Sequence, residues 1–124
     1  MKRFGFPPEH RLRNSEDYKR TFQNRQSVAD RWIVIYARVN QLPVTRMGMS
    51  VSRRAVGNAT KRNRLRRLYR EAFRLIRETL PSGLDLVIIP RRRSEEPTLE
   101  DLKRSLRAMV KKVARKLAQD QQQA

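Results

Sequence analysis

The sequence contains no cysteine, one histidine and only 12 acidic residues among its 124 residues. Without cysteine, the chain can form neither disulfide bonds nor thiolate metal sites. The histidine is His10, and the acidic residues are scattered, so no spacing resembles a metal site, a catalytic triad or a phosphate-binding glycine loop. These absences favour a binding protein with no bound cofactor over an enzyme that carries its own catalytic residues.

Long hydrophobic runs are absent as well. No apolar stretch reaches the roughly 18 residues that suggest a membrane-spanning helix, and the start, MKRFGFPPEH, lacks the apolar core of a signal peptide. We therefore expect a cytoplasmic protein with no membrane partner and no small-molecule substrate. The length of 124 residues fits one domain of ordinary size.

Positive charge is what the sequence has in excess. It holds 30 Lys and Arg residues against 12 Asp and Glu residues, a formal net charge of +18. Arginine is far commoner than lysine, and its planar guanidinium group suits paired hydrogen bonds to phosphate and stacking on bases. The expected partner is therefore a nucleic acid.

The segment from Arg53 to Arg77 carries half of this charge. Ten basic residues stand there against one acid, Glu71, which gives +9 of the total +18. Its apolar residues recur at the spacing of a helix that is buried along one side, and its arginines fall on the opposite side. The apolar residues are Leu65, Leu68, Tyr69, Ala72, Ile76 and Leu80, and the arginines are Arg66, Arg67, Arg70, Arg74 and Arg77.

Helix signals flank this segment. Asn58 or Thr60 can cap the start, and Pro81 with Gly83 ends the helix. Like charges four residues apart, such as Arg66 and Arg70, repel each other, and a bound polyanion would relieve that cost. Phosphate binding is thus favoured over the alternative, a basic face that only meets water.

The rest of the chain predicts one α/β domain between two polar ends. The apolar run Leu84–Ile89 has the continuous pattern of an internal strand, and Thr98 with Asp101 resembles a capping box. The order of elements is αβββαβα. The expected parts are a flexible basic arm (1–13), a helix (15–24), strands (27–29, 31–39 and 46–52), the arginine helix, a strand (84–89), a helix (99–118) and a frayed polar tail (119–124), with the single RNA-binding domain spanning 14–118.

Two of the expected strands suggest a binding groove. The strand 31–39 places Tyr36 on one face, and the strand 46–52 places the small residues Gly48, Ser50 and Ser52 on one face. If the two strands pair, these faces form a shallow floor on which an extended nucleic acid could stack its bases. The alternative is a floor covered by a helix as ordinary core. Tyr18 and Phe22, four residues apart on the helix 15–24, can likewise be core residues.

The stretch GMSVSRRAVGNATKRNRLRRLYREAFR, from Gly48 to Arg74, resembles the protein subunit of bacterial ribonuclease P. Members of that family have a small-residue strand, a basic pair, Gly-Asn-Ala, and then Arg-Asn and a further basic pair on the following helix. The resemblance covers about Arg11 to Leu117. It implies a two-layer α/β sandwich around a four-stranded sheet, ribosomal-protein-S5-domain-2-like, with a left-handed βαβ crossover.

The resemblance also implies a division of labour between protein and RNA. The partners would be the ribonuclease P RNA, which holds the catalytic Mg²⁺, and precursor tRNA, whose 5′ leader is removed. No catalytic residue or metal ligand is expected in the protein. Residues expected to contact the catalytic RNA are Arg53, Arg54, Lys61, Arg62, Asn63, Arg64, Arg66, Arg67 and Arg70, and those expected to line the leader cleft are Tyr18, Phe22, Trp32, Tyr36, Ser50, Ser52 and Arg91.

Three other functions fit parts of the pattern. A structural RNA-binding protein, for example one bound to ribosomal RNA, would use the same arginine helix without any preference for a leader. A protein-only nuclease conflicts with the scattered carboxylates. DNA compaction is the third, although the sequence has no recognition-helix signature and an arginine stripe suits A-form RNA equally well.

Overall fold

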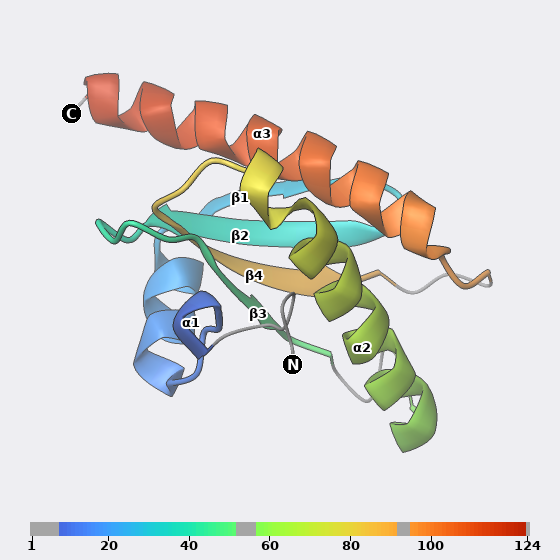
Figure 1. Ribbon diagram of the computed structural model, residues 1–124. Helices are drawn as coiled ribbons and strands as arrows, with labels where there is room; N and C mark the ends of the chain where they lie inside the picture. The colour runs from blue at the N-terminus through green and yellow to red at the C-terminus, as the bar shows by residue number, and fades with distance from the viewer. Residues whose placement is uncertain (1–7, 52–56, 92–94, 124) are drawn as a thin grey trace.

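The computed structural model describes residues 8–51, 57–91 and 95–123, and its helices pack on a four-stranded sheet (Figure 1). Helix α1 precedes strands β1, β2 and β3, helix α2 leads into β4, and helix α3 ends the chain. The predicted order αβββαβα is confirmed. The bounds are α1 Ser15–Gln23, β1 Gln26–Ala29, β2 Ile33–Val39, β3 Arg46–Met49, α2 Ala59–Ile76, β4 Leu84–Pro90 and α3 Leu99–Gln123, with 3-10 turns at Pro8–His10 and Arg77–Thr79.

The sheet has the strand order β1-β2-β4-β3. Strands β1 and β2 form a hairpin, β4 runs antiparallel to β2, and β3 runs parallel to β4. Helix α2 connects that parallel pair, because a parallel connection has to cross over the sheet. The α/β fold class with a four-stranded sheet is confirmed. The pairing suggested for the strands 31–39 and 46–52 is wrong, because β4 lies between them.

Helices α2 and α3 cover one face of the sheet and form the main core with it. Strand β2 contributes Ile33, Ile35 and Ala37, which alternate along the strand, share one face and are all fully buried. Strand β4 is buried on both faces, in keeping with its continuous apolar run. Helix α2 buries the predicted Tyr69, Ala72 and Ile76, and also Phe73, whereas the predicted Leu65 and Leu68 are only half-buried. Leu80 is buried as predicted but lies beyond α2, which ends at Ile76 and not just before Pro81. Helix α3 buries Leu102, Leu106, Val110, Val113 and Leu117.

Helix α1 packs on the opposite face of the sheet (Figure 1). Its start is capped by Asn14, whose side-chain oxygen accepts a hydrogen bond from the Asp17 amide at 2.9 Å. A row of paired residues, Tyr36, Val87 and Gly48, crosses the sheet beneath this helix. Gly48 is required there, because a Cβ atom would overlap the Tyr18 hydroxyl and lie 2.9 Å from the Leu12 Cβ.

Both ends of the described chain have more secondary structure and more contacts than the sequence predicts. Leu12 is buried, and Arg11 bridges to Met47 of β3, so residues 8–13 of the predicted arm lie along the sheet. Helix α3 begins with the predicted capping box of Thr98 and Asp101. It continues through 119–123, which were predicted as a frayed tail, and the Asp120 carboxylate there accepts a hydrogen bond from the β1 residue Gln26.

None of the helices in the described part of the chain combines the length and the apolar character that crossing a membrane requires.

Candidate nucleic-acid interface

The arginine face of α2 begins at a well-capped helix start. The Asn58 side-chain oxygen accepts hydrogen bonds from the amides of Thr60, at 2.8 Å, and Lys61, at 3.3 Å. These bonds satisfy amides that have no partner within the helix, so they hold the first turn in place. Of the residues expected to contact the catalytic RNA, Lys61, Asn63, Arg64, Arg67 and Arg70 are exposed, Arg62 and Arg66 are half-buried, and Arg53 and Arg54 lie outside the described residues.

Acidic residues neutralise only part of this helix. Arg74 forms an ion pair with Glu71, and its hydrogen bonds hold the pKa of the Glu71 carboxyl below its usual value. Arg64 forms an ion pair with Glu96. Within the described residues, Arg67 and Arg70 have no acidic partner within 4 Å, so they face water as free cations. The predicted stripe therefore retains positive charge at its centre.

The aromatic residues Tyr18, Phe22 and Tyr36 all lie on the α1 face of the sheet, where Phe22 contacts Tyr36 and the Tyr18 hydroxyl lies over Gly48 of β3. Phe22 and Tyr36 are half-buried and pack edge to face, with ring centroids 5.0 Å apart. The Tyr18 hydroxyl accepts a hydrogen bond of 3.2 Å from the Met49 amide. Helix α1 thus covers the floor suggested by the sequence, while the rings along its side stay partly accessible.

The other residues expected in the cleft are less well gathered. Ser50 is exposed directly after β3, and Arg91 is exposed directly after β4, where its guanidinium donates a hydrogen bond of 3.0 Å to the Asp30 carbonyl. Ser52 lies outside the described residues. Trp32 packs against the core that α2 and α3 cover, so the structure does not bring it together with Tyr36.

Trp32 has a structural setting of its own. The guanidinium carbon of Arg31 lies 4.6 Å from the centre of its ring, a cation–π contact. Its carbonyl accepts a hydrogen bond of 3.3 Å from the Tyr69 hydroxyl. Burial raises the pKa of that hydroxyl, because a phenolate would lose its hydration there. These contacts join the start of β2 to α2.

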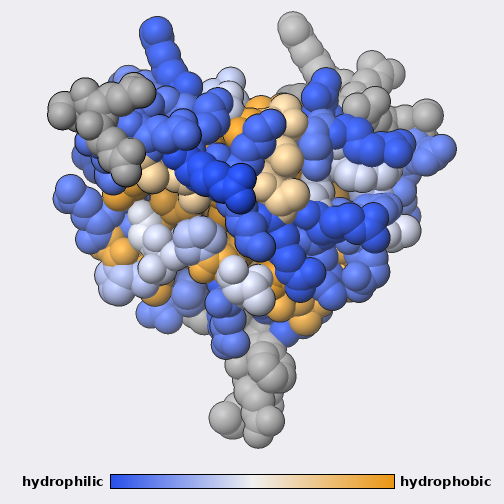
Figure 2. Space-filling view, turned by 90° about the horizontal axis from the view of Figure 1, so that it is seen from above, coloured by the Kyte–Doolittle hydropathy of each residue, from blue (hydrophilic) through white to orange (hydrophobic). Residues whose placement is uncertain are grey.

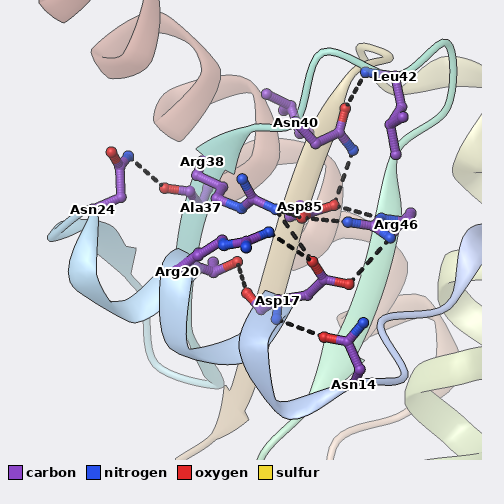
Figure 3. Close-up of polar contacts among 12 residues, drawn as sticks. Asn14, Asp17, Arg20, Asn24, Ala37, Arg38, Asn40, Leu42, Arg46 and Asp85 are labelled. Carbon is purple, nitrogen blue, oxygen red and sulfur yellow. Dashed lines mark hydrogen bonds and ion pairs between the residues drawn. The ribbon is translucent and has the colours of Figure 1, made fainter.

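A buried ion-pair network fixes α1 to the sheet (Figure 3). Asp85 of β4 is fully buried, and its carboxylate accepts bonds from Arg46 at 2.7 and 2.8 Å and from Arg38 at 2.9 Å. Asp17 of α1 lies 3.3 Å from Arg46 and 3.4 Å from Arg38. Asn40 adds a bond of 2.9 Å to Asp85. Two carboxylates and two guanidinium groups from four elements thus share one site beside the aromatic face.

Sequence reasoning missed this network. The apolar run Leu84–Ile89, in which Asp85 lies, predicted only an internal strand. Asp85 was the available signal, because an acid inside a strand that is buried on both faces requires a cationic partner. Neither this network nor any other part of residues 8–51, 57–91 and 95–123 brings together three or more His, Cys, Asp or Glu side chains that could hold a metal ion.

Comparison with known proteins identifies the family. The model of the family described as Ribonuclease P matches residues 6–114. The chain belongs to the ribonuclease P protein family. A ribonuclease P protein component from Caldanaerobacter subterraneus subsp. tengcongensis is 38% identical over 102 residues, which are 82% of this chain and 87% of that protein. The one from Brevibacillus brevis is 41% identical over 104 residues, which are 83% of this chain and 82% of that protein.

Solved structures of ribonuclease P proteins have the same fold. The protein from Thermotoga maritima aligns with a TM-score of 0.74 at 32% identity, covering 82% of this chain and 96% of that one. A Staphylococcus aureus ribonuclease P protein mutant, described as defective in mRNA degradation activity, aligns with a TM-score of 0.73 at 30% identity, covering 86% and 89%. Membership in this family makes the chain a protein component of an endoribonuclease complex in tRNA processing.

Proposed function

We propose that this chain is the protein subunit of a ribonucleoprotein that removes the 5′ leader of precursor tRNA in the cytoplasm. In this proposal the arginine face of α2 binds the catalytic RNA, and the aromatic face beside α1 binds the single-stranded leader. One observation carries the proposal: the two surfaces have different chemistry and lie on opposite faces of the same sheet. One protein can therefore contact two RNAs at once.

The arginine face supports contact with a folded RNA. Arg67 and Arg70 are exposed one helical turn apart, and Lys61 and Arg64 extend the row toward the start of the helix. Guanidinium groups bind phosphate oxygens in pairs, and such contacts depend on backbone shape and not on base sequence. A rigid row of cations on a capped helix fits the phosphate backbone of a structured RNA.

The aromatic face supports contact with a single strand. The rings of Phe22 and Tyr36 are half-buried, so each is held by its neighbours and still offers an accessible edge or face. Unpaired bases stack on such rings with little sequence preference. The exposed Ser50 at the end of β3 adds a hydroxyl group that can bond to phosphate or sugar. A leader of varied sequence is the kind of ligand that such a surface suits.

The cleavage chemistry belongs to the RNA subunit in this proposal. The RNA subunit and its Mg²⁺ ions would supply the activated water. The residues of this chain would bind the two RNAs, neutralise phosphate charge between them and hold the leader beside the catalytic RNA.

The decisive experiment is reconstitution with a bacterial ribonuclease P RNA and a precursor tRNA at low Mg²⁺. We expect cleavage at the mature 5′ end only when RNA and protein are both present. A protein that binds RNA without restoring cleavage would favour a structural RNA-binding role. Activity in a protein-only control would instead indicate that the protein itself is a nuclease. This control is needed because the Staphylococcus aureus structure is described as that of a mutant with defective mRNA degradation activity.

A variant separates leader binding from general RNA binding. Replacing Phe22 and Tyr36 by leucine removes the stacking surface and keeps apolar volume. We expect the affinity advantage of precursor over mature tRNA to fall roughly 5- to 160-fold, since one stacked base contributes about 1–3 kcal/mol. The affinity for the catalytic RNA should stay within about twofold. An unchanged precursor advantage would remove this face from the leader contact.

A further inference from the structure

The outer face of α3 carries a second row of positive charge that none of the sites above uses. Arg104, Arg107, Lys111, Lys112 and Arg115 are all exposed. No acidic residue occurs between Asp101 and Asp120. Figure 2 looks at the molecule from the side of α3 and shows a band of hydrophilic residues across that face. This face contains five of the 30 basic residues of the chain.

Helix geometry aligns four of these cations. At about 100° per residue, Arg104, Arg107, Lys111 and Arg115 fall within an arc of roughly 80°. The buried residues of α3 lie on the other side of the helix and hold it against the sheet. At about 1.5 Å per residue, the row extends roughly 16 Å along the helix axis. The four side chains therefore form a straight line that points away from the core.

Among the residues that the structure describes, no acidic side chain forms an ion pair with Arg107, Lys111 or Arg115. The acids at the start of α3 are already engaged, since Glu100 bonds to Lys103 at 3.1 Å and hydrogen bonds to Thr98 lower the pKa of Asp101. Lysine or arginine pairs four residues apart, such as Arg107 with Lys111, repel each other and destabilise a free helix. A face that served only solubility would mix charges of both signs. The unbalanced row is therefore suited to a polyanion.

The chemistry of the row favours a double-helical RNA over a single strand. Helix α3 contains no aromatic residue from 99 to 123, so it offers no surface on which bases can stack. A straight row of cations on a rigid helix fits a regular phosphate backbone, whereas a flexible single strand would lose entropy without gaining stacking. The expected contacts are with phosphate oxygens alone.

We propose that the row Arg104, Arg107, Lys111 and Arg115 binds the phosphate backbone of a helical region of the catalytic RNA. Helices α2 and α3 pack side by side on the same face of the sheet, whereas the proposed leader surface lies on the opposite face. The row thus lies beside the surface proposed for the catalytic RNA and away from the one proposed for the leader. This inference rests on the proposed function and adds a second contact to it.

The test compares two triple variants that change the charge equally. The α3 variant is Arg107→Gln, Lys111→Gln and Arg115→Gln, and the control is Arg13→Gln, Lys19→Gln and Arg25→Gln. All six side chains are exposed, and the control residues lie at or near α1. The measurement is the affinity of each full-length protein for ribonuclease P RNA, without substrate, as a function of salt at fixed Mg²⁺.

We expect the slope of log affinity against log salt to be less steep by about 2 to 3 in the α3 variant, because each phosphate contact contributes about 0.9 to this slope. Its affinity at 0.1 M salt should fall at least roughly tenfold. The control should change the slope by less than about one. Equal slopes for the two variants would overturn the proposal. Circular dichroism and the urea midpoint confirm that both variants are folded.

A further variant distinguishes failure of the α3 contact from failure of the proposed function. A variant with Arg67→Gln and Arg70→Gln tests the α2 contact alone. If it flattens the slope and the α3 variant does not, the inference fails and the proposed function stands. If neither variant changes the slope, the proposed contact of α2 with the catalytic RNA fails as well.

Two other ligands complete the design. Affinity for mature tRNA should be equal in the α3 variant and its control, and a selective loss would transfer the contact to the substrate. Vesicles containing phosphatidylserine test an anionic membrane. Loss of vesicle binding in the α3 variant with an unchanged RNA slope would overturn the proposal in favour of a lipid surface.

Discussion

The fully buried Asp85 is the residue whose replacement we expect to destabilise this fold most. Its carboxylate bonds to two arginines and to Asn40 at distances from 2.7 to 2.9 Å. The Arg38 Nε atom is buried without a hydrogen-bond partner among the described residues, so the site already lacks one acceptor. Asp85→Asn removes the charge and retains one carbonyl oxygen for two guanidinium groups.

The expected loss is about 3–5 kcal/mol of unfolding free energy, the usual effect of breaking a buried ion pair from one side. For a domain of this size, a loss of 1 kcal/mol of unfolding free energy lowers the melting temperature by about 4 °C, so the melting temperature should fall by about 12–20 °C. The total unfolding free energy of natural domains is about 5–15 kcal/mol. The variant should therefore be marginally folded at 37 °C.

The assay is urea unfolding followed by circular dichroism, with Glu100→Gln as the control. Glu100 is exposed and pairs with Lys103, so its loss should cost less than about 1 kcal/mol. A second comparison places Asp85→Asn in an Arg46→Met background. In that background, Asp85→Asn should lower the unfolding free energy by about 0.5–3 kcal/mol less than it does in the wild-type protein, because one of the two arginines that would lose their partner has already been removed.

A loss below about 1 kcal/mol for Asp85→Asn would refute this reasoning, since it would mean that Asp17 alone can satisfy both arginines. Additive effects of the two substitutions would refute the claim that Asp85 and Arg46 act as one unit.

Three further predictions concern local geometry. Gly48→Ala should destabilise the protein by about 1–3 kcal/mol in urea unfolding, because its methyl group would overlap Tyr18; an unchanged midpoint would contradict this packing. Asn58→Ala should cost about 1 kcal/mol and speed hydrogen exchange in the first turn of α2, and equal exchange would show that the cap is not used. The pKa of Asp101, measured by NMR, should lie below its ordinary value because its carboxylate accepts hydrogen bonds from Thr98. A carboxyl group whose pKa is lower in the folded state stabilises the fold at pH values above its pKa in the unfolded chain, and this contribution is lost as the pH falls through its pKa in the folded state. Asp101→Asn should therefore weaken the pH dependence of the unfolding free energy near pH 4.

Local patterns predicted the elements well, because they depend on neighbours in the chain. The spacing of Tyr69, Ala72 and Ile76 predicted the buried side of α2, and the continuous apolar run Leu84–Ile89 predicted an internal strand. The order of the strands could not be predicted this way. Pairing of β4 between β2 and β3 joins segments more than 30 residues apart, and no local period encodes it.

The candidate site was predicted in part for the same reason. Tyr18 and Phe22 lie four residues apart, so helix geometry places them on one side, and Phe22 does meet Tyr36. Trp32 was expected in the cleft from the family resemblance, but it precedes β2 in a bend of the chain and packs against the core on the other face. The contribution of Asp85 depends on three distant partners and required the fold to be seen.

The position of β4 bears on how the protein is made. This central strand spans residues 84–90, so until it leaves the ribosome, β3 has no partner in the sheet and β1 and β2 form only a hairpin. An isolated hairpin is at best marginally stable. The basic helix α2 is synthesised before the sheet that buries its apolar side, and contacts of such long range slow folding. Growing chains should thus expose cationic and apolar surface together until the segment 84–123 has been synthesised. We expect the addition of this segment to protect the nascent protein from premature association with RNA or with other chains.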